Sequence, residues 1–299
     1  MKNYCKYFSP VTDVTFRKVF GEHIDLAASL LNAFLPLEDG RTISELHYLP
    51  PELMPKTPTR KGSIVDLHCT DSTGATFLVE MQLNWESDFF KRVFFNASKA
   101  YVRQLTEGER YKLLKPVYSL NFVTGDLHKG LSEWYHPYQF VHIYHTDRVF
   151  DGLKIVFAEI DKYKKLAVKG DSKKDLWMRY FTEMTADTRT PAPELLADPD
   201  IAKAVKLLEV INYNKAEEYL YDRYWDGVSV EATWKGIGRD EGLQKGLQQG
   251  REEGLLQGLQ QGREEERRSL VRNLYAAGLA PAAIAKMTGL DKKEIERLL

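Results

Sequence analysis

The stretch SIVDLHCTDSTGATFLVEMQ, residues 63–82, restricts the fold more than any other part of the sequence. Two apolar runs with an alternating pattern flank the turn residues 71–74, which predicts a β-hairpin with one face in the core. The first run contains Asp66, and the second ends on Glu80 with Gln82 two residues later. A hairpin that otherwise suits a core therefore places two carboxyl groups and an amide on its strands.

Strand periodicity predicts where these polar side chains point. Glu80 and Gln82 share one face of their strand, and Met81 lies on the other. A turn at 71–74 places Asp66 almost opposite Glu80, where two carboxylates repel each other and lose hydration. Mg²⁺ or Mn²⁺, which prefers oxygen ligands, is the simplest compensation and can activate water for attack on phosphorus. The spacing alone also allows both acids to face solvent on an edge hairpin with nothing bound.

The rest of the N-terminal half reads as alternating helices and strands. Helices are expected in the ranges 11–21, 24–35 and 87–107, and strands in the ranges 43–49, 116–124, 138–145 and 154–160. The four prolines of 49–59 make that segment a loop. This order predicts an α/β or α+β domain of about 160 residues. From 172 to 230 the pattern is mostly helical, with short helices expected at 200–212 and 214–225.

The C-terminal tail differs in kind from the rest of the chain. Glycine recurs at every fourth position from 238 to 262, within the duplicated blocks GLQKGLQQGREE and GLLQGLQQGREE. Each glycine costs a helix roughly 1 kcal/mol relative to alanine. A partly helical spacer and a helix that packs closely against another copy both remain open. The last residues, 267–299, have a helix–turn–helix rhythm that fits either DNA contact or a packing cap.

Composition excludes several classes of protein. The 299 residues carry a formal net charge of −1, so a whole-chain basic signature for nucleic acid is absent. No apolar run is long enough for a membrane span, and the N-terminus has no signal-peptide pattern. The two cysteines, Cys5 and Cys69, form no disulfide framework. We therefore expect a cytoplasmic protein without a membrane segment.

The histidines give no metal-binding pattern at this level. His142 and His145 lie three residues apart on a strand-like segment, where they face opposite sides, so zinc binding is not expected. The other histidines show no partner spacing: His23, His47, His68, His128 and His136.

Three segments together carry a family resemblance. They are DVTFRKVFG (13–21), Asp66 with EMQ (80–82) on the hairpin, and FFKRVFFNASKAYVRQL (89–105) on the long helix. Their combination resembles the Rpn family of recombination-promoting nucleases and transposases, which have a PD-(D/E)XK core, over roughly residues 8–230. The first segment is the most diagnostic, and the family pattern is matched at Asp13, Phe16, Arg17, Phe20 and Gly21.

The resemblance implies a Mg²⁺-dependent DNA endonuclease with a restriction-endonuclease-like mixed sheet flanked by helices. Asp66 and Glu80 match the two metal-binding acids, with the backbone carbonyl of Met81 as a further ligand. Gln82 stands where the wider superfamily has lysine, and glutamine can orient water but carries no charge. The candidates for the missing positive charge are Lys61, Arg17 and Arg92. Asp13 is either a third acid of the site or the N-cap of its helix.

These observations predict a chain in four parts and a nuclease function. The parts are a nuclease-like core (1–170), a helical extension (171–237), a Gly-repeat helical spacer (238–266) and a small helical segment (267–299). The expected function is metal-dependent cleavage of DNA linked to recombination, transposon-like mobility or defence, with homo-oligomerisation through the tail. The alternatives are a catalytically silent DNA-binding or assembly protein and a regulatory subunit whose tail recruits a partner.

Overall fold

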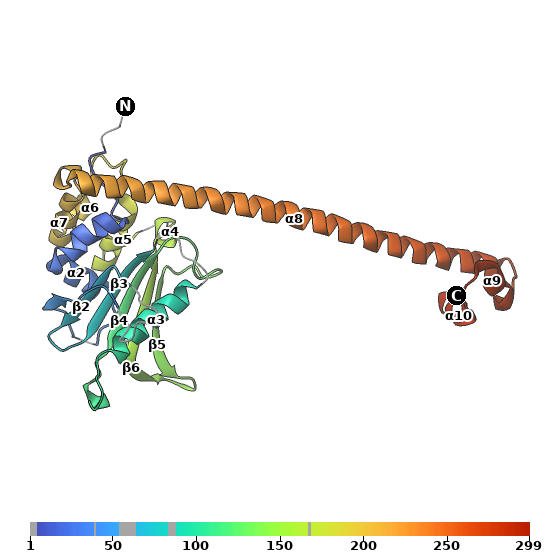
Figure 1. Cartoon of the computed structure of the whole chain (residues 1–299), viewed down its shortest axis with the longest axis horizontal. Helices are drawn as coiled ribbons and strands as arrows, with labels where there is room; N and C mark the ends of the chain where they lie inside the picture. Colours follow the sequence, from blue (N-terminus) through green and yellow to red (C-terminus); the bar gives the residue numbers. More distant parts are fainter. Residues whose placement is uncertain (1–4, 39, 54–63, 83–87, 167–168) are drawn as a thin grey trace. The chain divides into compact units, whose positions relative to one another are not determined.

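A mixed β-sheet forms the centre of the N-terminal part of the chain (Figure 1). The computed structural model describes residues 5–38, 40–53, 64–82, 88–166 and 169–299. Within them, six strands pair in the order β1-β2-β3-β4-β6-β5. The strands are β1 (Leu46–Tyr48), β2 (Leu67–Asp71), β3 (Thr76–Gln82), β4 (Val117–Val123), β5 (Tyr135–His142) and β6 (His145–Glu159). β3, β4 and β6 are parallel, so their C-terminal ends meet at one edge of the sheet.

Helices cover both faces of this sheet. The helices of the N-terminal part are α1 (Asp13–Phe16), the π-helical turn η1 (Arg17–Gly21), α2 (Ile24–Phe34), α3 (Phe89–Val102), η2 (Tyr111–Leu113), α4 (Ile160–Lys164), α5 (Lys173–Glu183), α6 (Pro193–Ala197), α7 (Pro199–Leu207) and η3 (Val210–Asn212). α2 and α5 lie on one side of the sheet and α3 on the other. The fold is a mixed sheet with flanking helices and a C-terminal helical region, which confirms the predicted fold class.

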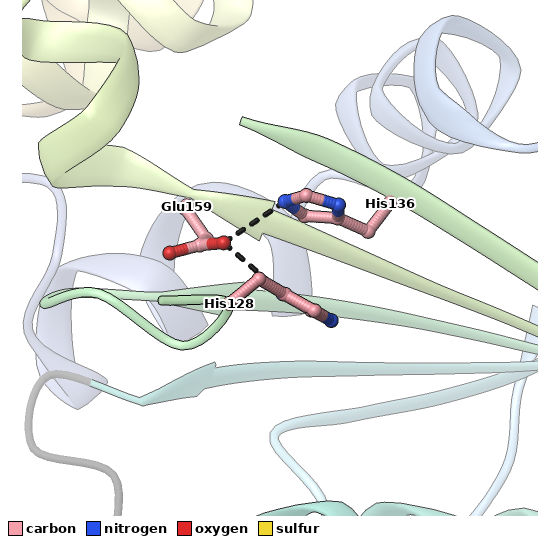
Figure 2. A group of neighbouring side chains, drawn as sticks. All are labelled: His128, His136 and Glu159. Carbon is pink, nitrogen blue, oxygen red and sulfur yellow. Dashed lines mark hydrogen bonds and ion pairs between the residues drawn. The ribbon is translucent and has the colours of Figure 1, made fainter. Parts of the chain in front are cut away.

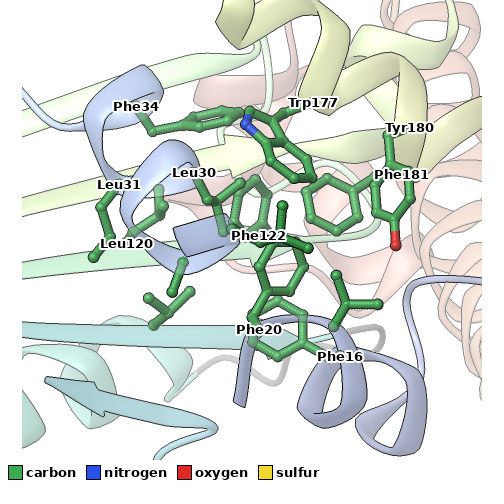
Figure 3. Packing of buried hydrophobic residues seen from close by; sticks show 14 of the residues in the cluster. Phe16, Phe20, Leu30, Leu31, Phe34, Leu120, Phe122, Trp177, Tyr180 and Phe181 are labelled. Atoms are coloured by element: carbon green, nitrogen blue, oxygen red, sulfur yellow. The ribbon is translucent and has the colours of Figure 1, made fainter. Parts of the chain in front are cut away.

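The larger core fills the face that α1, α2 and α5 cover (Figure 3). Aromatic rings from distant parts of the chain meet there. Phe122 of β4 lies 5.0 Å from Phe34 of α2 and 4.7 Å from Phe181 of α5, measured between ring centroids. Burying each such side chain contributes about 1.5–3 kcal/mol. Phe16 and Phe20 of the DVTFRKVFG segment belong to the same core, so packing alone explains why these two positions are aromatic.

The hairpin has the register that its sequence predicts. Leu67 pairs with Val79 and His68 with Leu78, so Asp66, one residue before β2, comes opposite Glu80 of β3. The turn between the strands depends on Asp71, whose Oδ1 accepts the backbone N–H groups of Thr73 and Ala75 at 3.0 Å each. A turn fixed in this way sets the pairing of every later residue on the two strands.

Several predicted elements have different bounds in the structure. The strand expected at 138–145 ends at His142, and β6 begins at His145 rather than 154, because the two form one hairpin. The short helix expected at 214–225 is wrong as a separate element. α8 (Lys215–Ala276) runs without a break through the glycine repeat. The Leu, Gln, Arg and Glu residues between the glycines favour helix enough to offset the cost of the glycines.

The chain divides into two compact units, residues 1–225 and 226–299. In the second unit, α9 (Pro281–Thr288) and α10 (Lys292–Leu298) pack with the end of α8 around Val271, Ile284 and Ile295. Gly289 ends α9 in the left-handed conformation, with φ of 74°, as a helix C-terminus favours. Nothing lies within 4 Å of a Cβ built on the repeat glycines from Gly242 to Gly262.

None of the helices in the described part of the chain combines the length and hydropathy that a membrane span requires.

Candidate functional site

Asp66 and Glu80 meet beside the C-terminal end of β3. The N–H of Met81 donates to Asp66 Oδ2 at 2.7 Å, which ties the carboxyl group to the neighbouring strand. Glu80 is only 7% exposed and points to the sheet face that α3 covers. The side chain of Met81 belongs to the core on the opposite face. The pairing of the strands thus brings together the two acids that are 14 positions apart in the sequence.

Asp13 and Arg17 act on the same carboxyl group. Burial, together with the negative charges of Asp13 and Glu80, raises the pKa of Asp66 to about 7, against the opposing effects of the Met81 N–H and the Arg17 charge. Desolvation also raises the pKa of Asp13, against the charge of Arg17. The sequence left two roles open for Asp13. Thr12 is the N-cap of α1, and its hydroxyl accepts the N–H of Thr15, so the carboxyl group of Asp13 is not used as the cap.

The π-helical turn η1 explains part of the DVTFRKVFG segment. π-Helical turns are rare and frequently mark functional sites. A Cβ added to Gly21 would lie 3.2 Å from Cγ of Arg17, tighter than ordinary packing. The glycine therefore leaves room for the stem of the arginine whose charge reaches Asp66.

Arg92 of α3 lies against both Glu80 and Gln82. Its Nη2 is 3.6 Å from Glu80 Oε2 and donates a hydrogen bond to Gln82 Oε1. Asn96, one turn later, donates to Glu80 Oε1 at 2.8 Å. Burial raises the pKa of Glu80, and the Asn96 hydrogen bond and the Arg92 charge partly offset it. An arginine from the helix thus places positive charge beside Glu80 and the uncharged amide of Gln82.

The backbone of Met81 faces the same acids. The carbonyl of Gln82 accepts the N–H of Thr124, so residue 82 pairs toward β4. Successive residues of a strand pair toward opposite edges, and the N–H and C=O of one residue share an edge. The carbonyl of Met81 is therefore directed to the Asp66 side, as is the N–H that Asp66 accepts. Lys61, the remaining candidate for a positive charge, lies outside the described residues.

The structure forms a second polar cluster that the sequence did not reveal (Figure 2). His128, His136 and Glu159 have their ligand-type atoms within 4.8 Å of one another. Glu159 Oε1 lies 3.1 Å from His128 Nδ1 and 2.9 Å from His136 Nε2. These two histidines therefore share a partner in the fold although the sequence shows no partner spacing for them. They come from a loop and from β5, so no spacing in the sequence could have linked them.

Glu159 is fully buried, and its charge is already compensated. Lys162, three residues later, lies 3.0 Å from Glu159 Oε1, and the N–H of Leu127 donates to Oε2 at 2.8 Å. The two histidine rings stack with centroids 4.0 Å apart. Residues of these types can hold a metal. The adjacent ammonium group and the stacked rings instead fit a buried ion network around one carboxylate.

The two clusters occupy the same edge and face of the sheet. Gln82 pairs with Val123, and Val123 pairs with Glu159, so the three side chains share a face. Two strand spacings separate Gln82 from Glu159, roughly 10 Å. The described residues thus hold one acid cluster with raised pKa values and, beside it, one carboxylate neutralised by donors.

A family model agrees with this arrangement. The model for the PD-(D/E)XK nuclease family transposase matches residues 10–228. The chain belongs to this family. The match includes α1, the whole sheet and the helices up to the start of α8. Neither the comparison with curated proteins nor the comparison with solved structures found a match.

Membership in the PD-(D/E)XK family supports a nuclease, in general terms a hydrolase with DNA as substrate. Such nucleases generally use divalent metal ions. The donor set around Asp66 fits an ion of this kind. Its carboxylate and carbonyl oxygens are the hard ligands that Mg²⁺ and Mn²⁺ prefer. Burial raises the pKa of Asp66, Glu80 and Asp13, and the donors and cations beside them offset this only in part.

Proposed function

We propose that the chain is a divalent-metal-dependent endonuclease that hydrolyses phosphodiester bonds of DNA. The observation that carries this proposal is the gathering of Asp13, Asp66 and Glu80 at one strand end, where burial and mutual repulsion raise the pKa of Asp66 to about 7. Asp66, Glu80 and the carbonyl of Met81 would hold Mg²⁺ or Mn²⁺. A bound ion of this kind supplies Lewis acidity, which provides a nucleophile at neutral pH and neutralises charge on the phosphoryl group.

The remaining side chains of the site orient groups and balance charge. The amide of Gln82 can position the attacking water, and Arg92 holds that amide while it faces Glu80. Arg92 would also stabilise the charge that develops on the scissile phosphate, a role that a neutral glutamine cannot fill. Arg17, whose charge acts on Asp66, would contact a neighbouring phosphate.

A catalytically silent DNA-binding protein is the main alternative, and the position of the cations weakens it. That alternative would gain support if no positive charge lay near the two acids. The charge of Arg17 acts on Asp66, and Arg92 lies 3.6 Å from Glu80. Replacing the usual lysine by Gln82 therefore leaves the site with arginines in compensating positions.

Cleavage of supercoiled plasmid by the purified chain tests the proposal. The expected result is nicking in Mg²⁺ or Mn²⁺, none in EDTA, and a loss of more than about 100-fold in Asp66→Ala and Glu80→Ala. Glu45→Ala, which removes an exposed acid before β1, is the matched control and should cleave like the wild type. Equal activity in all four proteins would contradict the assignment of the site. DNA binding without cleavage would favour the silent protein.

We further propose that α8 allows two copies to associate, so that two sites can act on two strands. The repeat glycines are open, and the surface beside them exposes Leu247, Leu255 and Leu259 at 53–66%. A second copy could bury these leucines with close helix contact along the glycines. Mass measurement in solution, with the full chain and with a chain ending at residue 237, tests this. If the full chain and the shortened chain form particles with the same number of copies, the proposal is contradicted.

A role in recombination, transposon-like mobility or defence, and a cytoplasmic setting, stay predictions.

A further inference from the structure

An open apolar groove lies next to the proposed nuclease site, on the same face of the sheet. It encloses about 640 Å³ between α3 and the hairpin of β5 and β6. Six of the eleven residues that line it are aromatic: Phe90, Phe94, Phe95, Tyr138, Phe140 and Phe157. Several of these rings are open to a partner, since Phe94 is 47% and Phe140 45% exposed. We call this feature the aromatic groove.

The aromatic groove adjoins the candidate site through α3. Phe90, in its wall, is two residues before Arg92, which contacts Glu80 and Gln82. Phe157 pairs through Asn121 with Glu80 and lies on the same face. Phe90 and Phe157 touch, with ring centroids 4.8 Å apart. A chain of phosphates that passes Arg92 would therefore bring its bases to the groove.

The charge of α3 complements a polyanion. Residues 89–104 contain four basic side chains and no acidic one. Lys91 lines the groove, where it also contacts Asp88 at 2.9 Å, and Lys99 lies 5.4 Å from the ring of Phe95. Because the net charge of the whole chain is −1, this concentration is local. Basic side chains interleaved with exposed aromatic rings are the arrangement that binds single strands, with phosphates on the cations and bases stacked on the rings.

We propose that the aromatic groove takes unpaired nucleobases, so that the preferred substrate is single-stranded DNA or a duplex with an extruded or looped-out base. This inference deepens the proposed function, on which it rests, by naming the substrate class. Phe94 and Phe140, whose ring centroids are 6.1 Å apart across the groove, provide the stacking faces. A fully paired duplex cannot offer its base faces and would contact only the basic residues.

Fluorescence anisotropy of labelled oligonucleotides tests this with the full-length Asp66→Asn chain, which prevents cleavage during the measurement. The probes are a single strand, a perfect duplex and a duplex with a three-base bulge. The single strand and the bulged duplex should bind at least about fivefold more tightly than the perfect duplex. The double substitution Phe94→Ala and Phe140→Ala should remove that preference and change perfect-duplex binding less than about twofold.

Two further variants make the result specific. Phe94→Leu with Phe140→Leu keeps apolar volume but removes the aromatic faces, so it should behave like the alanine pair. Tyr111→Ala removes an aromatic side chain that is 84% exposed and does not line the groove, and it should bind like the parent. Equal affinity for all three probes in the parent protein would overturn the inference. A groove variant that changes the oligomeric state of the protein but not its DNA binding would identify the groove as a contact between protein chains. That result would also overturn the inference.

The outcome is separable from that of the proposed function. Metal-dependent plasmid cleavage together with equal binding of paired and unpaired probes would leave the nuclease proposal standing and refute the groove assignment. A groove-dependent preference for unpaired DNA without any cleavage would support the groove and refute the nuclease.

Discussion

Two carboxylate clusters on one face of the sheet differ in how their charge is balanced. Glu159 is fully buried and has Lys162, two histidines and a backbone N–H as partners. Asp66 and Glu80 face each other and Asp13, and burial raises the pKa of each of these acids. Charge that the fold itself neutralises stabilises the fold, whereas charge left uncompensated at a strand end suits a ligand that brings positive charge. The comparison supports the proposal that the first cluster serves stability and the second serves chemistry.

The largest effect on stability is expected at Glu159. Glu159→Gln keeps the size of the side chain but removes the charge opposite Lys162, which is 11% exposed. We expect the free energy of unfolding to fall by about 3 kcal/mol, at the low end for breaking a buried pair, because Asp126 still contacts Lys162 at 3.0 Å. Urea denaturation followed by circular dichroism measures this. If Glu159→Gln has the same free energy of unfolding as the wild type within error, the Glu159 cluster does not stabilise the fold as proposed.

The next effect is expected on catalysis at Arg92. Its side chain is 49% exposed, so Arg92→Gln should change the free energy of unfolding by no more than about 0.5 kcal/mol. Metal-dependent cleavage should fall about 10- to 100-fold, because the positive charge beside Gln82 is lost. Adding Gln82→Lys to this variant should restore part of the rate in the plasmid assay. A loss of rate that the lysine does not recover would speak against Arg92 as the substitute charge.

Asp66 should show the opposite sign of stability effect from Glu159. Its pKa is about 7 in the folded chain, so the folded state holds a proton that the unfolded state releases between about pH 4 and pH 7. That contribution to stability is complete at low pH and is lost as the pH rises through 7. In EDTA, Asp66→Asn should therefore be more stable than the wild type by about 1–3 kcal/mol at pH 8. Thermal unfolding at several pH values should show this stability difference shrinking toward pH 4. An Asp66→Asn variant that is less stable than the wild type at pH 8 would contradict the prediction.

The smallest effect is the pH dependence of cleavage at subsaturating Mg²⁺. The carboxyl group of Asp66 must lose its proton to act as a ligand. With a pKa of about 7, cleavage should fall about tenfold from pH 8 to pH 6. Raising the Mg²⁺ concentration at pH 6 should recover the rate, because the metal competes with the proton. A rate that stays low at saturating Mg²⁺ would locate the titration in a different group.

The sequence predicted the acid site better than the ion network, for a physical reason. A two-stranded hairpin has one periodicity and one turn, so the position of Asp71 and Gly74 was enough to place Asp66 opposite Glu80. Arg92 and Asn96 follow on the next helix, and the family resemblance named the first of them. Glu159 is joined to His128 and His136 by the folding of three separate segments, and local patterns carry no trace of that. The one available signal was Lys162, three residues after a buried acid at the end of an apolar run.

The predicted ends of helices were wrong where tertiary packing, or the continuation of a helix into the next segment, decides where the helix ends. The predicted helix over 11–21 becomes a short α-helix and a π-helical turn, and Arg17 packs along Gly21 within that turn. The glycine repeat, expected as a separate spacer, continues α8 from Lys215 to Ala276. The fourfold division of the chain stays a prediction, although contacts within the chain separate units at residue 225.

Calorimetric titration with Mn²⁺ tests the central claim most directly, since it compares the two clusters without relying on turnover. The wild type and Glu159→Gln, at a temperature where both are folded, should bind the ion with similar affinity at pH 8. Asp66→Asn should lose the binding heat, because it removes a ligand oxygen from the proposed site. If Asp66→Asn still binds Mn²⁺ and Glu159→Gln does not, the metal site lies at the Glu159 cluster, which would contradict the account.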